Sequence, residues 1–187
     1  MRPNRRPETL HVFADGYAVF RRVRLACALG RGGVRTDKRE GDGATPTGRF
    51  PVRHVRFRPD RWRPQTALPA IPVLRSHGWS DDPADPLYNR FVRLPHPCGH
   101  ERLRRADRLY DALIVVGHND RPHRPGAGSA VFVHVMAEAE TPTAGCVAFR
   151  PADLAWLLAQ LRPGDDVTIH PPGRKSPGLP LRRDLRT

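Results

Sequence analysis

Glycine and proline interrupt this sequence so often that few long helices can form in it. The 187 residues include 16 glycines and 21 prolines, which favour turns. Between these turns lie short runs of β-branched and aromatic residues, a composition that is typical of strands. Such runs occur at residues 10–13, 17–20, 23–29, 50–57, 112–117, 130–135 and 167–169. The sequence therefore predicts a mainly β fold.

One segment near the C-terminus has the periodicity of a helix. Within residues 154–161, leucine occurs at i, i+3, i+4 and i+7, which places the leucines on one face. Pro151 precedes this face and Gly164 follows it, as at the start and end of many helices. We therefore expect one short C-terminal helix.

The length of the chain suits one domain with a hydrophobic core and not two large ones. We expect this domain at residues 9–170, between an N-terminal tail at 1–8 and a disordered tail at 171–187. Residues 58–108 are rich in Pro, Arg, Asp and aromatic residues. This composition predicts a long irregular insertion with little regular structure, which could act as a lid.

The chain has a large excess of positive charge. It carries 32 Lys and Arg residues against 19 Asp and Glu, a formal net charge of +13. Such an excess attracts polyanions, including nucleic acid, anionic lipid and acidic wall polymers. The arginines are scattered, however, without an RNA-binding or zinc-finger signature, so we expect no specific nucleic-acid partner. No stretch approaches ~18 consecutive apolar residues, so no transmembrane segment is predicted.

The three cysteines form no CxxC pair, which disfavours a disulfide framework or a cysteine-rich zinc site. Cys27 lies in an apolar run and is expected to be a buried structural thiol. Nothing around Cys98 marks it as reactive. Cys146 follows Gly145 at a turn, where backbone N–H groups can converge on one oxygen. Cys146 is therefore the candidate nucleophile, with an oxyanion site formed by the turn.

Two histidines could serve this thiol. His134 lies in the apolar run 130–135. It could be a base that takes up the thiol proton and holds a thiolate, or it could be a core residue with a purely structural role. His118 ends the preceding run and is followed by Asn119. Zinc bound by His118, His134 and Cys146 is disfavoured, because their spacing matches no known ligand pattern. We therefore expect no metal and no organic cofactor.

Two motifs together resemble a known family. Residues 41–50, GDGATPTGRF, match the pattern G-D-G-x-T-P-x-G-x-F. Further along the chain come a strand-borne His134, the turn TAGCV at 143–147 and a D-L-x-x-L-L helix that begins at Asp153. This ordered pair of signatures resembles the L,D-transpeptidase catalytic domain, also called the YkuD-type domain. The resemblance implies a small β-sandwich or barrel-like sheet with one helix.

The resemblance also implies an activity. Cys146 would attack the carbonyl before the terminal D-Ala of a peptidoglycan tetrapeptide stem, and the resulting thioester would pass to the amine of a neighbouring stem. His134 would act as base and acid, and the amides of Ala144, Gly145 and Cys146 would form the oxyanion hole. The family implies a periplasmic or cell-envelope location. The N-terminus shows no export signal, which keeps a cytoplasmic location as the alternative.

Two positions depart from the family pattern. Ala144 stands where members often have His, and Ala148 stands where many have Arg, with Arg150 the nearest arginine. We expect Arg150, His118 and Asn119 to contribute to substrate binding instead. An L,D-carboxypeptidase that passes the acyl group to water and a non-catalytic, basic wall- or nucleic-acid-binding module remain as alternatives. The oligomeric state is left open.

Overall fold

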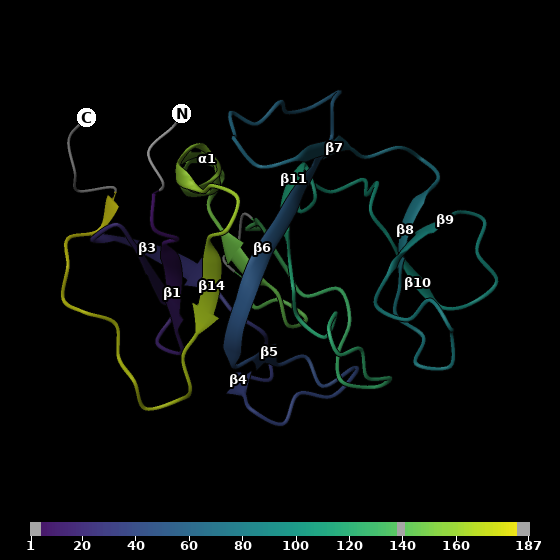
Figure 1. Ribbon diagram of the computed structural model, residues 1–187, viewed down its shortest axis with the longest axis horizontal. Coiled ribbons are helices and arrows are strands. Elements are labelled where there is room, and N and C mark those ends of the chain that lie inside the picture. The colour runs from purple at the N-terminus through teal and green to yellow at the C-terminus, as the bar shows by residue number, and fades with distance from the viewer. Residues whose placement is uncertain (1–4, 138–140, 183–187) are drawn as a thin grey trace.

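The computed structural model describes residues 5–137 and 141–182 (Figure 1). It confirms a mainly β fold with a single helix, α1 (Pro151–Gln160), in the part of the chain described. The strands are β1 (Thr9–Phe13), β2 (Tyr17–Phe20), β3 (Val23–Ala28), β4 (Val34–Arg35), β5 (Thr45–Pro46), β6 (Gly48–Phe57), β7 (Ala70–Pro72), β8 (His77–Ser80), β9 (Phe91–Arg93), β10 (His100–Arg102), β11 (Ala112–Val116), β12 (Phe132–Val135), β13 (Val147–Phe149) and β14 (Asp166–Ile169).

The main sheet closes on itself. Its strand order is β11-β12-β13-β3-β2-β1-β14-β6, and β6 also pairs with β11. The ten-residue strand β6 can do this because residues 48–51 pair with β14 whereas residues 52–57 pair with β11. β1–β14 and β12–β13 are parallel pairs, and the other pairs in the ring are antiparallel. A closed β-barrel or sandwich results, with no free edge in the ring.

Alternate residues of the strands fill the interior, as the period of two requires. Leu10, Val12 and Leu25 are fully buried, and α1 adds Leu154 and Leu158 to the same core. Proline at the first position of α1 suits the helix start, and the chain becomes extended again at its end. The predicted leucine face of α1 is therefore the face that packs against the barrel core.

The expectation of little regular structure in residues 58–108 is wrong in part. β7 pairs with β6, and β8 is the centre of a three-stranded antiparallel sheet with β9 and β10, on the right of Figure 1. These strands have three or four residues, too few for an alternating pattern to be visible in the sequence. Trp79 of β8, Val73 directly after β7 and Leu103 directly after β10 form a second hydrophobic cluster with barrel residues, including Phe132 and Cys146.

The C-terminal segment also differs from expectation. Residues 171–182, predicted to be disordered, run back to the barrel: Leu181 forms a β-bridge with Arg24, and Arg182 contacts the Asp153 carboxylate at 3.1 Å. The composition of the tail suggested disorder, but an ion pair with a buried carboxylate stabilises this path. Residues 1–4 and 183–187 of the predicted tails lie outside the described residues. Within the described part, no helix has the length and hydropathy needed to span a membrane.

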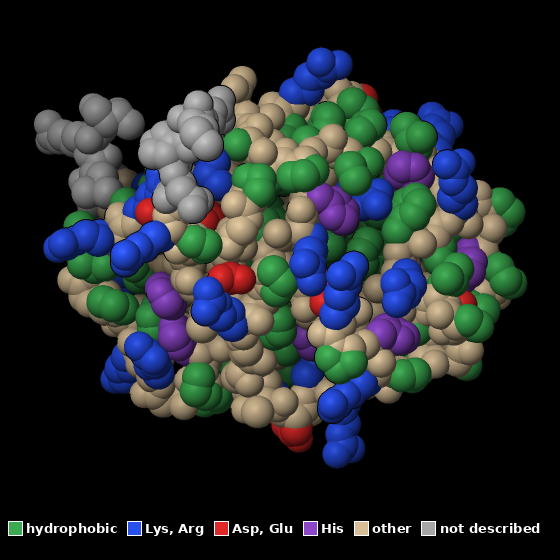
Figure 2. All heavy atoms as spheres, in the orientation of Figure 1, with side chains coloured by type: hydrophobic (Ala, Val, Ile, Leu, Met, Phe, Trp, Pro, Cys, Tyr) green, Lys and Arg blue, Asp and Glu red, His purple; other side chains and the backbone are tan. Residues whose placement is uncertain are grey.

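The positive charge is distributed over the surface. On the face seen in Figure 2, Lys and Arg side chains are spread among apolar and neutral atoms and form no single patch. Several are paired locally, for example Arg49 with Asp166 and Arg53 with Asp120. Such pairing reduces the field that a polyanion would meet at any one place.

Candidate active site

The turn before β13 has a geometry that only glycine can satisfy. Gly145 has φ +135°, and a Cβ at this position would lie 2.8 Å from the carbonyl oxygen of Ala44. Thr143 Oγ1 accepts the N–H of Gly145 at 3.1 Å and donates to the Cys146 carbonyl at 2.7 Å. Sequence and packing therefore hold Cys146 in one position.

The GDGATP loop lies directly against this turn. Thr45 Oγ1 accepts the Gly30 N–H at 2.8 Å and donates to the Cys146 carbonyl at 3.4 Å. The Asp42 carboxylate accepts the Ala44 N–H at 2.8 Å and pairs with Lys38. The two sequence signatures, about a hundred residues apart, thus form one structural unit.

The Cys146 thiol is buried, with 7% of the residue exposed. Its Sγ accepts the Phe132 N–H at 3.3 Å and donates to the Ala130 carbonyl at 3.2 Å. Burial raises the pKa of the Cys146 thiol to about 12, because a thiolate would lose its hydration. The Cys146 side chain is therefore a protonated thiol at neutral pH.

His134 lies on β12, the strand next to Cys146, and lines the same cavity. Its Nδ1 lies 2.7 Å from the Val135 carbonyl, which can only accept, so Nδ1 carries the proton and Nε2 is left as a base. Burial lowers the pKa of His134 to about 4. The expected thiolate held by the imidazole is thus not the resting state: both groups are neutral, and Sγ bonds to backbone groups.

The sequence did not predict the side chains that connect His134 to the insertion, which are Tyr110, Glu101 and Arg105. The Tyr110 ring meets the His134 imidazole edge-on at a centroid distance of 5.4 Å, and the Tyr110 hydroxyl donates to Glu101 Oε1 at 2.9 Å. Arg105 contacts the same carboxylate at 3.2 Å. Burial raises the pKa of Glu101 despite these partners. No sequence signal could have found this group, because only the folded insertion brings Glu101 and Arg105 to the barrel.

Cys146 and His134 open on a cavity of about 450 Å³. Its wall carries charges of both signs: Arg31, Lys38, Glu40, Asp81, Glu101 and Arg105. The last three come from the 58–108 insertion and its sheet, so the insertion forms one wall of the site. Of the predicted binding residues, Ala144 lines this cavity.

His118 and Asn119 do not line the cavity but hold a neighbouring loop. His118 Nε2 donates to the Ala127 carbonyl at 3.1 Å, and Asn119 Nδ2 donates to the Gly128 carbonyl at 3.0 Å. This loop leads directly to Ala130, whose carbonyl accepts a hydrogen bond from the Cys146 thiol. Both residues therefore hold the loop that precedes Ala130 and do not contact the cavity.

Arg150 also faces away from Cys146. Its guanidinium pairs with Asp153 at 2.8 Å, and it lines a second cavity of about 1030 Å³ with Arg61, Trp62 and Met136. A charged partner on α1 at i+3 accounts for this orientation. The expectation that Arg150 replaces the arginine missing at Ala148 is therefore not supported by its position.

A closed β domain, with a Gly-Cys turn beside a strand-borne histidine and a GDG loop packed against that turn, is the fold of the L,D-transpeptidase catalytic domain. The chain belongs to the YkuD family: the model of the L,D-transpeptidase catalytic domain matches residues 4–169.

Two solved structures are similar to the chain, each at 13% sequence identity. An L,D-transpeptidase from Mycobacterium smegmatis aligns with 88% of this chain and 58% of its own, with a TM-score of 0.43. L,D-transpeptidase 1 from Mycobacterium tuberculosis aligns with 87% and 61%, with a TM-score of 0.41. The chain thus spans about three fifths of the length of these proteins. No curated protein sequence matches it significantly.

Proposed function

We propose that this protein is a cysteine-dependent L,D-transpeptidase that acts on peptidoglycan stem peptides in the cell envelope. Membership of the YkuD family supports the reaction class. The observation that carries the proposal is the cavity that Cys146 and His134 line together, with Nε2 of His134 unprotonated because Nδ1 donates to the Val135 carbonyl.

In the first half-reaction, Cys146 Sγ bonds to the carbonyl carbon that precedes the terminal residue of a tetrapeptide stem. The thiol proton passes to His134 Nε2, and His134 then donates it to the leaving amine as the C–N bond breaks. The products are a thioester on Cys146 and a free D-amino acid. Because the resting pair is neutral, proton transfer accompanies the attack and does not precede it.

In the second half-reaction, the amine of a neighbouring stem attacks the thioester carbonyl. His134 Nε2 takes a proton from this amine and returns it to the departing sulfur, which restores the neutral pair. In the described residues, the N–H groups of Ala144 and Cys146 donate to no other group, whereas the Gly145 N–H is bound to Thr143. The amides of Ala144 and Cys146 therefore suit the oxyanion better than that of Gly145.

The charged wall of the cavity fits a stem peptide, which carries both carboxylate and ammonium groups. Arg31, Lys38 and Arg105 can bind carboxylates, and Arg can do so with two parallel hydrogen bonds. Asp81 and Glu101 can receive an ammonium group. The insertion would thus contribute to donor recognition.

The decisive experiment is incubation with a disaccharide-tetrapeptide, followed by mass spectrometry. We expect release of D-Ala, a cross-linked dimer and a thioester adduct on the intact protein. Cys146→Ala should abolish all three, whereas Cys27→Ala should keep turnover and lose about 1 kcal/mol or more of stability from the core.

Other outcomes identify the alternatives. Release of D-Ala without dimer, even at high acceptor concentration, would indicate a carboxypeptidase with water as acceptor. Binding to wall polymer that falls steeply with salt, without D-Ala release or a Cys146 adduct, would indicate a non-catalytic module. Full activity of Cys146→Ala would refute the nucleophile assignment.

A further inference from the structure

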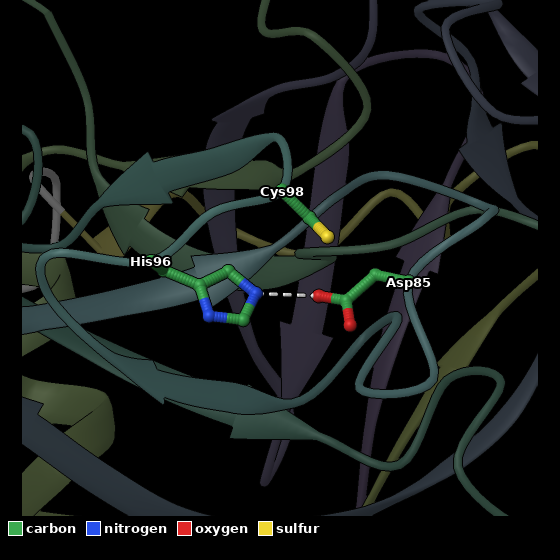
Figure 3. A group of neighbouring side chains, drawn as sticks. All are labelled: Asp85, His96 and Cys98. Carbon is green, nitrogen blue, oxygen red and sulfur yellow. Dashed lines mark hydrogen bonds and ion pairs between the residues drawn. The ribbon is translucent and has the colours of Figure 1, made fainter.

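A second cluster of chemically active side chains lies in the insertion, away from the catalytic cavity. Asp85 follows β8, and His96 and Cys98 lie in the connection from β9 to β10. Figure 3 shows the His96 ring, the Asp85 carboxylate and the Cys98 sulfur directed toward a common point. One ligand atom from each lies within 4.8 Å of the other two. The side chains of His96 and Asp85 are only 11% and 4% exposed.

We propose that Asp85, His96 and Cys98 bind a zinc ion, with water completing the coordination. The set offers one oxygen, one nitrogen and one sulfur, a combination that zinc accepts and that calcium and magnesium, which prefer oxygen ligands, do not. In a tetrahedral zinc site the ligand atoms lie about 3–4 Å apart, so side-chain adjustments of about 1 Å suffice.

The proposed ligands are already oriented by their own partners. Ser80 Oγ donates to Asp85 Oδ2 at 2.5 Å, and the Leu87 N–H donates to Oδ1 at 2.9 Å. His100 Nδ1 donates to the Cys98 carbonyl at 2.8 Å, which holds the backbone of the third ligand. Hydrogen bonds of this kind fix the ligands of known metal sites.

The local charge also favours a cation, although the chain as a whole is strongly positive. Gly99 packs against Asp81 and Asp82, which adds two carboxylates beside the cluster. His96 Nε2 lies 2.6 Å from Asp85 Oδ2, and zinc would take the position of the proton between them. His96 would then carry its single proton on Nδ1, and Cys98 would release its thiol proton to solvent.

Zinc at this place would link the β8–β9 connection, which carries Asp85, to the β9–β10 connection, which carries His96 and Cys98. Ser80 at the end of β8 pairs with His100 at the start of β10, and the next residues along, Asp81 and Glu101, line the catalytic cavity. A metal that joins these connections would therefore hold one wall of the cavity. This consequence depends on the proposed function, but zinc binding itself does not.

The test is metal binding to the metal-free protein of 187 residues, without any assay of activity. Equilibrium dialysis against ZnCl₂ with elemental analysis should give one zinc per chain, and Co²⁺ should produce a thiolate charge-transfer band in the near ultraviolet. Cys98→Ser and His96→Gln should each lose the stoichiometric zinc, and Cys98→Ser should also lose the band. Ser80→Ala should weaken binding by about 10–100-fold, because it removes a partner of the Asp85 ligand.

Cys146→Ser is the matched control, since it removes the other candidate thiol. It should keep the zinc and the cobalt band. Zinc should raise the Tm of the wild-type protein and of Cys146→Ser but not that of His96→Gln, whose metal-free Tm reports whether it is folded. Retention of the metal in a folded Cys98→Ser or His96→Gln variant, loss of the metal in Cys146→Ser, or no stoichiometric zinc in the wild type would overturn the proposal.

Discussion

At the scale of single residues, burial decides the chemistry of the Cys146–His134 pair. Desolvation raises the thiol pKa to about 12 and lowers the imidazole pKa to about 4, so it opposes the ion pair on both sides. The Val135 carbonyl compensates by orienting the imidazole with Nε2 unprotonated. In the mechanism that we propose, His134 therefore acts as a base during attack and does not store a thiolate beforehand.

His134→Ala tests this role. We expect turnover to fall by about 10²–10⁴-fold, as for the loss of a general base, while iodoacetamide still labels Cys146 at alkaline pH. The measurements are D-Ala release and the pH profile of labelling followed by mass spectrometry. In the wild type, labelling should keep rising above pH 9 and show no plateau near neutrality, because burial raises the thiol pKa. A labelling plateau near pH 7 that depends on His134 would instead restore the thiolate hypothesis.

At the scale of elements, the loop that ends in β5 and the turn before β13 act as one unit. Thr45 is fully buried and connects the Gly30 N–H with the Cys146 carbonyl, and Gly145 packs on Ala44. The turn thus takes its shape partly from a loop that is remote in sequence. This contact joins the two signatures in the folded protein.

Thr45→Val should disturb this unit without changing the volume of the side chain much. The Gly30 N–H loses its acceptor in a buried place, so we expect a loss of about 1–3 kcal/mol in stability and a lower kcat. Denaturant unfolding and D-Ala release measure the two effects. Thr47→Val is the control, because Thr47 Oγ1 bonds to Thr36 Oγ1 in an exposed pair. Equal effects in both variants would contradict the prediction.

At the scale of the whole molecule, the insertion and the barrel share a core. Trp79 of the insertion contacts Phe132 of β12, and Asn89 Nδ2 donates to the carbonyls of His118 and Asn119. Removal of the insertion would therefore expose barrel residues as well as open the cavity. Point substitutions on its inner wall are the better test of its role in donor binding.

Arg105→Ala should raise the KM for the tetrapeptide donor several-fold, because it removes a cation from the cavity wall. Labelling of Cys146 by a small reagent should persist. Arg104→Ala is the neighbouring control: Arg104 pairs with Asp60 at 3.0 Å and does not line the cavity. If Arg105→Ala and Arg104→Ala have the same KM as the parent, the insertion does not recognise the donor through Arg105.

The pH dependence of unfolding is a further property of the whole fold. Burial lowers the pKa of His134 to about 4, below its unfolded value of ~6.5, so unfolding takes up protons as the pH falls. Stability should therefore be present above pH ~6.5 and decrease toward pH 4. Thermal unfolding at a series of pH values measures this decrease, and His134→Gln should reduce it. A Tm that is independent of pH from 7 to 4.5 would contradict the prediction.

The pattern of residues along the chain was sufficient for most strands of the barrel, the helix and the pair of signatures that identify the family. These features are local: alternation, leucine spacing and a turn that requires glycine are visible within ten residues of sequence. The same locality explains why residues 100–102 were not recognised as a strand, and why no pattern marked Glu101 and Arg105 as part of the site.

Only the tertiary structure decided which charged side chains line the cavity at Cys146. Closure of the barrel through β6 and docking of the insertion bring Lys38, Glu101 and Arg105 into one cavity, while the same packing turns His118 toward Ala127. Desolvation in that cavity then sets the protonation of Cys146 and His134, since the cost of a buried charge depends on everything that excludes water from it.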